Sequence, residues 1–164
     1  MSDRIRHVLF LCTGNSARSI LAEAALRALG GGRFVAHSAG SRPTGRVHPL
    51  ALACLSARGF PTDGLRSKSW DEFGAPDAPE IDVVLTVCGS ARGEACPVWP
   101  GHPATAHWGV EDPAAFEGSE AERRAFFEAT LDRLEARIRR LLALPLDELD
   151  PAALKQALAA IGEA

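Results

Sequence analysis

Short apolar runs alternate with longer amphipathic stretches along this chain. The short runs are typical of strands buried within a parallel sheet. The predicted strands span residues 7–11, 34–37 and 81–87, with a weaker one at 104–108. Two stretches rich in Ala and Leu, each followed by glycine, predict helices at residues 20–29 and 50–58.

Two more helices are predicted in the C-terminal part of the chain. Ser119 and Glu122 have the spacing of a capping box, in which the hydroxyl and the carboxylate each bind a free amide of the first turn. The apolar residues that follow fall on one helical face: Phe127, Leu131, Leu134, Ile138 and Leu141. Pro145 ends this helix, and Asp150 and Pro151 open a last amphipathic one.

The order of these elements predicts an α/β fold. Strands that alternate with helices form a parallel sheet, and helices cover both of its faces in three layers. Binding sites in such sheets lie at the carboxyl ends of the strands. Cys12 follows the first predicted strand and Cys88 follows the third. The sequence therefore draws attention to one edge of the sheet and to these two thiols.

Composition and charge narrow the choice of partners. The net charge of −3 argues against nucleic acid as a general partner. The apolar runs are far shorter than the roughly 20 residues of a membrane span, and the polar start Met1–Arg6 lacks a signal-peptide pattern. We therefore expect a cytoplasmic protein that does not bind membranes. In a reducing cytosol its four cysteines should be catalytic, redox-active or buried.

The most informative segment lies between the first strand and the first helix. Backbone amides of such a loop, together with the positive end of the helix dipole, bind oxyanions. Arg18 can hold two oxygens through its planar fork, and the same positive field favours the thiolate form of Cys12. A nucleophile and its electrophile are thus expected in one loop. Its oxyanion-binding residues are Thr13, Gly14, Asn15, Ser16, Ala17, Arg18 and Ser19.

The segment VLFLCTGNSARSILAEA resembles the opening of the low-molecular-weight protein tyrosine phosphatase superfamily, which includes a branch of arsenate reductases. The resemblance implies a four-stranded parallel sheet with helices on both faces. It also implies that Cys12 is the nucleophile and Arg18 the oxyanion clamp. Ser19 would donate a hydrogen bond to the thiolate, and Asn15 would shape the loop.

Other residues distinguish the two branches of the superfamily. Reduction of arsenate requires two electrons, which Cys88 and Cys96 could supply by forming a disulfide. The segment 105–113 resembles the part of the reductases that carries the general acid, and the match assigns this role to Asp112. The phosphatases usually have tyrosines beside the acid, but this chain contains no tyrosine, and Ala17 replaces their second loop cysteine. The predicted activity is therefore arsenate reduction.

The implied mechanism is a disulfide relay within a catalytic domain formed by residues 1–145, with 146–164 as a C-terminal helical extension. Cys12 attacks arsenate while Asp112 protonates the departing oxygen. Cys88 then attacks Cys12 and arsenite leaves, after which Cys96 attacks Cys88. No cofactor is expected to stay bound. An external thiol reductant, either thioredoxin or glutathione with glutaredoxin, would reduce the final disulfide.

Two other functions are compatible with the same loop. If Cys88 and Cys96 are inert, the chain would be a phosphotyrosine or small phosphate-ester phosphatase. A redox or metal sensor without turnover is the second alternative. Zinc could use Cys88, Cys96, His102 and His107, but their spacing fits no usual zinc site, and we expect no bound metal.

The remaining cysteine, two loop residues and the three tryptophans are expected to have structural rather than chemical roles. Cys54 lies among apolar residues of a helix and should be a packed core thiol. Arg42 and His48 follow the second strand and are expected to be solvated loop residues. The tryptophans Trp70, Trp99 and Trp108 are expected to be packing residues.

A potassium site is a further implication of the resemblance. Some relatives bind potassium beneath the loop through residues that match Asn15, Glu23 and Ser38, together with an aspartate. In this chain Lys68 occupies the place of that aspartate, and its own charge would make the cation unnecessary.

Overall fold

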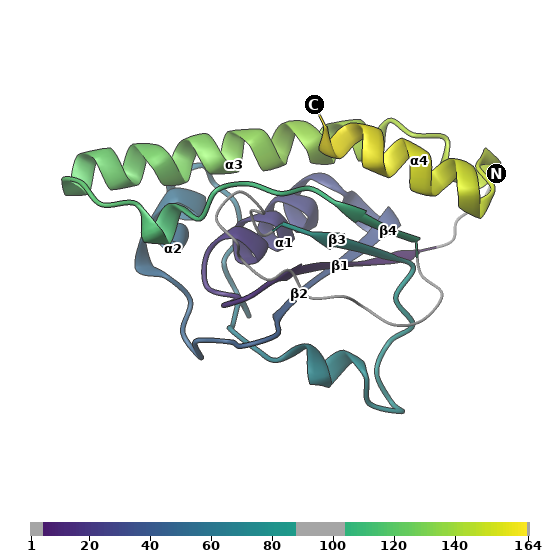
Figure 1. Cartoon of the computed structure of the whole chain (residues 1–164), viewed down its shortest axis with the longest axis horizontal. Coiled ribbons are helices and arrows are strands. Elements are labelled where there is room, and N and C mark those ends of the chain that lie inside the picture. Colours follow the sequence, from purple (N-terminus) through teal and green to yellow (C-terminus); the bar gives the residue numbers. More distant parts are fainter. Residues whose placement is uncertain (1–4, 88–103, 164) are drawn as a thin grey trace.

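A computed structural model of the chain describes residues 5–87 and 104–163 (Figure 1). The strands are β1 (Arg6–Cys12), β2 (Phe34–Gly40), β3 (Val83–Thr86) and β4 (Ala104–His107). The α-helices are α1 (Arg18–Leu29), α2 (Pro49–Ala57), α3 (Glu120–Leu142) and α4 (Pro151–Gly162). Short 3₁₀ helices are η1 (Gly31–Arg33), η2 (Trp70–Phe73), η3 (Pro113–Ala115) and η4 (Leu146–Glu148). The predicted strands and α-helices are confirmed, whereas the 3₁₀ helices were not predicted.

The four strands form one parallel sheet in the order β2-β1-β3-β4. The register pairs Cys12 at the end of β1 with Gly40 at the end of β2, and Leu11 with Thr86 of β3. Because all strands run in the same direction, their carboxyl ends meet at one edge. The loop that follows β1 therefore has the segment after β2 as a neighbour.

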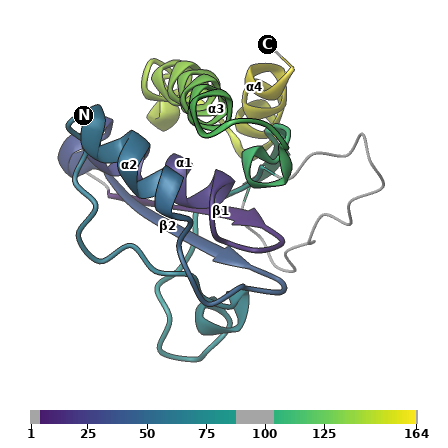
Figure 2. The same cartoon turned by 90° about the vertical axis from the view of Figure 1, so that its left-hand side faces the viewer.

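Both faces of the sheet are covered, but unequally (Figures 1 and 2). Val8, Phe10 and Cys12 point to the main core, which all four α-helices complete. Leu9 and Leu11 point to the opposite face, where Trp70 and Phe73 of η2 pack against a smaller cluster. Prolines and glycines recur between residues 60 and 80, which restricts helix formation there to this single short helix.

The capping box of α3 is present as predicted. Ser119 Oγ accepts a hydrogen bond from the Glu122 amide at 3.1 Å, and Glu122 accepts one from the Ser119 amide at 3.1 Å. At the other end of the chain, α4 packs on β4 and α3, and Leu158 and Ile161 are buried in the main core. Among the described residues, no helix combines the length and apolar character that crossing a membrane requires.

Two histidines form a pair on the η2 face of the sheet. His7 Nδ1 and His37 Nε2 are 2.9 Å apart, and the rings stack at an interplanar angle of 9°. Phe73 packs edge-on against the His37 ring. Burial lowers the pKa of His37 to about 4, and the charges of His7 and Lys68 act in the same direction. The folded protein therefore favours the neutral form of His37.

This pair predicts a loss of stability in mild acid. The stabilising contribution of neutral His37 is complete above pH 6.5, the usual histidine value, and is lost as the pH falls toward 4. Because the His37 ring is only half-buried, we expect the free energy of unfolding to fall by about 1–2 kcal/mol after screening by solvent. Urea unfolding at pH 7 and pH 5 measures it. His37→Gln should weaken this pH dependence, and an unchanged dependence would contradict the interpretation.

Candidate active site

The loop between β1 and α1 is held from outside by the segment that follows β2. Amides of residues 41–48 donate to its carbonyl groups: Ser41 to Cys12 at 3.3 Å, Arg42 to Thr13 at 2.9 Å, Thr44 to Gly14 at 3.0 Å and His48 to Ser16 at 2.9 Å. In a trans peptide the next amide points opposite to the carbonyl. The following amides of the loop therefore point inward, toward the side of the Cys12 thiol.

The N-terminus of α1 adds to this positive field. No side chain caps it, and its first turn contains no acidic residue. Uncapped first-turn amides and the helix dipole together favour a bound anion. Gly40 makes the close approach of β2 possible, because a Cβ at this position would collide with the Thr13 carbonyl oxygen.

Asn15 organises the interior of the loop. Its backbone adopts the left-handed conformation with φ of 47°, which asparagine tolerates better than most residues. Its side-chain Nδ2 donates to Ser19 Oγ at 2.7 Å and to Ser38 Oγ at 3.0 Å, while Oδ1 accepts from the Lys68 amide at 2.8 Å. The fully buried Asn15 thus connects the loop to β2 and to the segment before η2.

The sulfur of Cys12 is buried and lies within this network. Ser19 Oγ is 2.9 Å from Sγ, and the Asn15 amide donates to Sγ at 3.2 Å. Because Ser19 Oγ already accepts a hydrogen bond from Asn15, its own hydrogen is left to donate to the sulfur. Two hydrogen-bonding groups, one from a side chain and one from the backbone, are thus directed at one sulfur.

A buried carboxylate lies behind the loop. Glu23 Oε1 accepts from Ser38 Oγ at 2.5 Å, and Oε2 accepts from Arg27 at 3.0 Å. Lys68 Nζ is 3.9 Å from Glu23 Oε1, and its side chain is only 9% exposed. Burial lowers the pKa of Lys68, while the Glu23 carboxylate opposes that shift. The lysine ammonium thus lies beside the residues expected to hold potassium in relatives.

Arg18 and Asp112 meet at the same end of the sheet. The Arg18 side chain is 4% exposed, and its NH1 donates to the Val110 carbonyl at 3.4 Å. Its NH2 lies 3.7 Å from Asp112 Oδ2. Asp112 also caps η3, because Oδ1 accepts from the Ala114 amide at 3.0 Å. The carboxylate predicted as general acid therefore lies beside the predicted oxyanion clamp.

His48 differs from the solvated residue that the sequence predicted. Its Nδ1 accepts from the Leu50 amide at 3.1 Å and so caps α2, and its ring packs against Phe127. Burial lowers the pKa of His48. Its backbone amide is also one of the donors that hold the cysteine loop. The Pro49 that follows it marks a helix start, but nothing in the sequence indicates this backbone contact.

Of the three other cysteines, the structure describes only Cys54. Cys54 is buried within the main core, as expected, and burial raises the pKa of its thiol. Cys88 and Cys96 lie outside the described residues, as do His102 and Trp99. Within the described ranges, no group of three or more metal-binding side chains is found.

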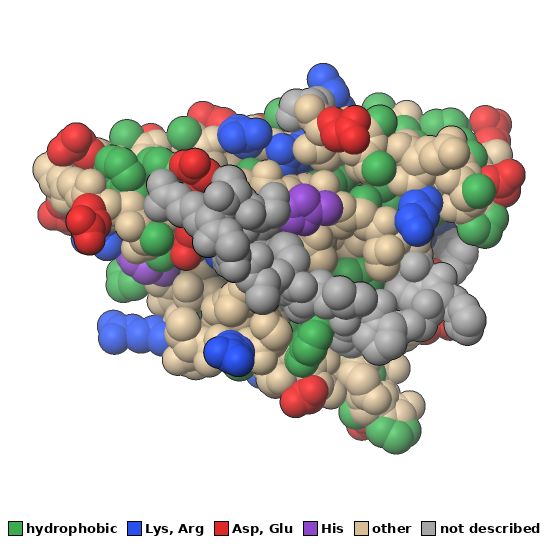
Figure 3. Space-filling model, viewed as in Figure 1, with side chains coloured by type: hydrophobic (Ala, Val, Ile, Leu, Met, Phe, Trp, Pro, Cys, Tyr) green, Lys and Arg blue, Asp and Glu red, His purple; other side chains and the backbone are tan. Residues whose placement is uncertain are grey.

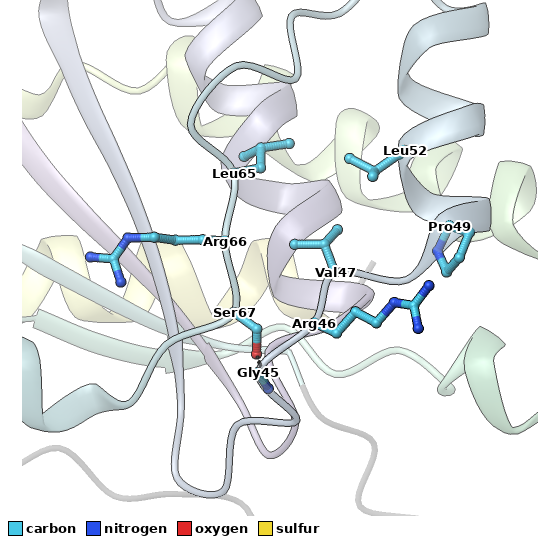
Figure 4. Close-up of a pocket in the computed structure, with 8 residues that line it drawn as sticks. All are labelled: Gly45, Arg46, Val47, Pro49, Leu52, Leu65, Arg66 and Ser67. Atoms are coloured by element: carbon cyan, nitrogen blue, oxygen red, sulfur yellow. Dashed lines mark hydrogen bonds between the residues drawn. The ribbon is translucent and has the colours of Figure 1, made fainter.

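A hollow of about 540 Å³ lies on the outer side of the loop rather than at its amide ring (Figure 4). Val47, Leu52 and Leu65 form its apolar wall, while the Arg46 side chain extends toward Pro49 and that of Arg66 points away from the other lining side chains. On the face shown in Figure 3, acidic and basic side chains are interspersed. Attraction of an anion on this face therefore depends on the local groups of the loop.

Sequence comparisons relate the chain to arsenate reductases. The family model described as low molecular weight phosphotyrosine protein phosphatase matches residues 7–157. An arsenate reductase of Bacillus licheniformis is 37% identical over 134 residues, covering 81% of this chain and 92% of that protein. An arsenate reductase of Bacillus subtilis is 33% identical over 132 residues, covering 80% and 91%.

Solved structures give the same relationship. Arsenate reductase from Archaeoglobus fulgidus is 28% identical with a TM-score of 0.68, covering 84% of this chain and 99% of that one. A thioredoxin-dependent arsenate reductase of Corynebacterium glutamicum is 28% identical with a TM-score of 0.61, covering 86% and 62%. The family match over most of the chain, together with the parallel sheet and its cysteine loop, shows that this protein belongs to the low molecular weight phosphotyrosine protein phosphatase family.

Proposed function

We propose that this protein is an arsenate reductase that uses Cys12 as nucleophile and a relay of cysteine thiols. The observation that carries the proposal is the position of the Cys12 sulfur, which lies 2.9 Å from Ser19 Oγ in the first turn of α1 and accepts a hydrogen bond from the Asn15 amide. The names of the most similar curated relatives favour arsenate over phosphate esters as the substrate class.

In the first step arsenate binds to the loop amides and to Arg18. The Cys12 thiolate attacks arsenic and forms a sulfur–arsenic bond, while one oxygen departs. The departing oxygen belongs to an As–OH group of arsenate, so one proton transferred from Asp112 as general acid lets it leave as water. Asp112 lies 3.7 Å from NH2 of Arg18. This position supports the assignment, because the departing oxygen of an arsenate bound to Arg18 would lie next to the carboxyl group.

The second step is the reduction itself. Cys88 attacks Cys12 Sγ, a disulfide forms between them, and the electron pair of the sulfur–arsenic bond goes to arsenic. Arsenic is thereby reduced from the +5 to the +3 state and leaves as arsenite. Cys96 then attacks Cys88 and releases the Cys12 thiolate. The support for Cys88 and Cys96 is their position in the sequence: Cys88 follows the end of β3, and Cys96 comes later in the segment that joins β3 to β4.

An external dithiol completes the cycle by reducing the Cys88–Cys96 disulfide. We favour thioredoxin, because a structural relative is named as thioredoxin-dependent and because a disulfide between two protein cysteines suits dithiol exchange. Glutathione with glutaredoxin is the alternative donor. Such reductants maintain thiols in the cytoplasm, which is where we place the protein.

Phosphate-ester hydrolysis is the second candidate function. The family includes phosphotyrosine phosphatases, and a loop that binds arsenate also fits phosphate because both are tetrahedral oxyanions. An arsenate reductase that is 26% identical, with a TM-score of 0.64, was solved in a phosphate-binding state. We expect slow hydrolysis of aryl phosphates as a side activity that depends on Cys12 and not on Cys88.

Replacing the relay thiol separates the two functions. Cys88→Ser should abolish multiple turnover of arsenate, because the sulfur–arsenic bond is formed but no second thiol breaks it. Slow hydrolysis of an aryl phosphate should persist. The measurements are arsenate-dependent NADPH oxidation with a thioredoxin system and release of the phenol from the ester.

Two variants serve as controls for this experiment. Cys12→Ser should lose both activities, whereas Cys54→Ser, at a buried thiol remote from the loop, should retain both. Full arsenate turnover by Cys88→Ser would contradict the relay. If the wild-type chain hydrolyses the ester but never reduces arsenate, the phosphatase function replaces the proposal.

The ammonium of Lys68 predicts that arsenate binding is independent of potassium. It already provides a positive charge next to Glu23, so the Michaelis constant for arsenate should agree between sodium and potassium buffers of equal ionic strength. Lys68→Met should raise this constant several-fold, because one of the two cations beside Glu23 is lost. The rise should be the same in both buffers, because Arg27 still pairs with Glu23. A constant that falls several-fold in potassium for the wild type would overturn this expectation.

A further inference from the structure

The segment 108–112, which ends at Asp112, lies between two buried arginines. From the loop side, Arg18 donates to the Val110 carbonyl at 3.4 Å. From the opposite side, Arg137 of α3 donates through NH1 to the Trp108 carbonyl at 2.8 Å and to the Gly109 carbonyl at 3.2 Å. Three consecutive carbonyl groups of one segment are therefore bound by guanidinium groups.

Arg137 has an unusual environment for a buried cation. It is 4% exposed, and no described carboxylate forms an ion pair with it. Its Nε lacks a hydrogen-bond partner among the described residues. A buried cation without a carboxylate is costly, so its carbonyl contacts must compensate. These contacts all go to the backbone of segment 108–112 and of α4.

The C-terminal helix supplies the other half of this arrangement. Arg137 NH2 donates to the Gly162 carbonyl at 3.2 Å, and the Trp108 indole Nε1 donates to the Leu158 carbonyl at 2.9 Å. Carbonyls at a helix C-terminus have no partner within the helix and carry the negative end of its dipole, so they are well suited to a guanidinium group.

The contact between α4 and β4 is close. A Cβ at Gly162 would collide with the His107 carbonyl oxygen, so glycine is required for this approach. The family match ends at residue 157, and both carbonyls that α4 contributes, those of Leu158 and Gly162, lie beyond it. The arrangement therefore combines the body of the fold with the last turns of this chain.

We propose that Arg137, Trp108 and the C-terminal turns of α4 form a clamp that positions Asp112 for proton transfer. The inference rests on the proposed role of Asp112 as general acid. The clamp fixes the backbone at residues 108 and 109, the Val110 amide binds the Val87 carbonyl at 3.2 Å, and Arg18 binds the Val110 carbonyl. Asp112 follows Val110 by two residues, so the fixed backbone determines where its carboxylate lies. Arg137 and Trp108 are positioning residues, because neither touches the substrate.

The test compares chemistry with oxyanion binding in the full-length protein. Arg137→Met retains the length of the side chain but removes the donors, and Trp108→Phe retains an aromatic ring but removes Nε1. In both variants the rate of single-turnover arsenate reduction should fall by about tenfold or more, since displacement of a catalytic group by about 1 Å costs up to about a hundredfold. The inhibition constant of phosphate should change less than about twofold, because the loop itself is unaltered.

A double-mutant cycle distinguishes positioning from a general structural effect. If Arg137 acts through Asp112, its replacement should have little further effect in the Asp112→Asn background. An equal loss in both backgrounds would overturn the clamp. So would a wild-type rate in folded Arg137→Met and Trp108→Phe.

Controls keep the outcomes separate. Arg140→Met replaces an exposed arginine of α3 and should leave the rate unchanged. Leu55→Ala removes core packing at α2 and should lower Tm while it leaves the hydrogen bonds of Arg137 and Trp108 in place, so its rate measures the effect of lost stability. If Asp112→Asn keeps the wild-type rate, the general-acid role fails. If Asp112→Asn is impaired but the clamp variants are not, only the clamp fails.

Discussion

The chemistry of this protein depends on the orientation of a few peptide groups. The carbonyls of residues 12–14 and 16 are bound on the outer side of the loop by amides of residues 41–48, which turns the following amides to the inner side, where that of Asn15 donates to the sulfur. Without these partners the peptide groups could rotate, and the loop would lose the amide orientation that suits a bound oxyanion. The nucleophile therefore depends on a neighbouring loop as much as on its own sequence motif.

The strand order explains how groups from several segments of the chain meet at the cysteine loop. β1 lies between β2 and β3, so the loop after β1 has neighbours on both sides at the same edge. From the β2 side come the amides that hold the loop and the Ser38 hydroxyl. Beyond β3, the segment after β4 carries Asp112 to Arg18. Lys68 contacts Asn15 from behind the loop, which places a compensating charge near the buried Glu23.

The sequence predicted the features that depend on side-chain pattern and missed those that depend on the backbone. Apolar periodicity was sufficient for the strands and α-helices. The Cys-x₅-Arg spacing drew attention to Arg18 and the resemblance of segment 105–113 to Asp112, and these two side chains lie together in the structure. The capping by His48 and the carbonyl contacts of Arg137 have no sequence signature, because backbone partners can be any residue. The roles of Cys88 and Cys96 remain predictions, since both residues lie outside the described part of the chain.

The tight contact at Gly40 has a consequence for protein engineering. The end of β2 and the cysteine loop approach each other so closely that no side chain fits between them, which means that the oxyanion site is encoded in two separate stretches of sequence. Transplanting the Cys-x₅-Arg motif alone onto another strand and helix would carry over the reactive groups without the backbone that aligns them. A portable version of this centre would have to include both strands and the turn that joins β2 to α2.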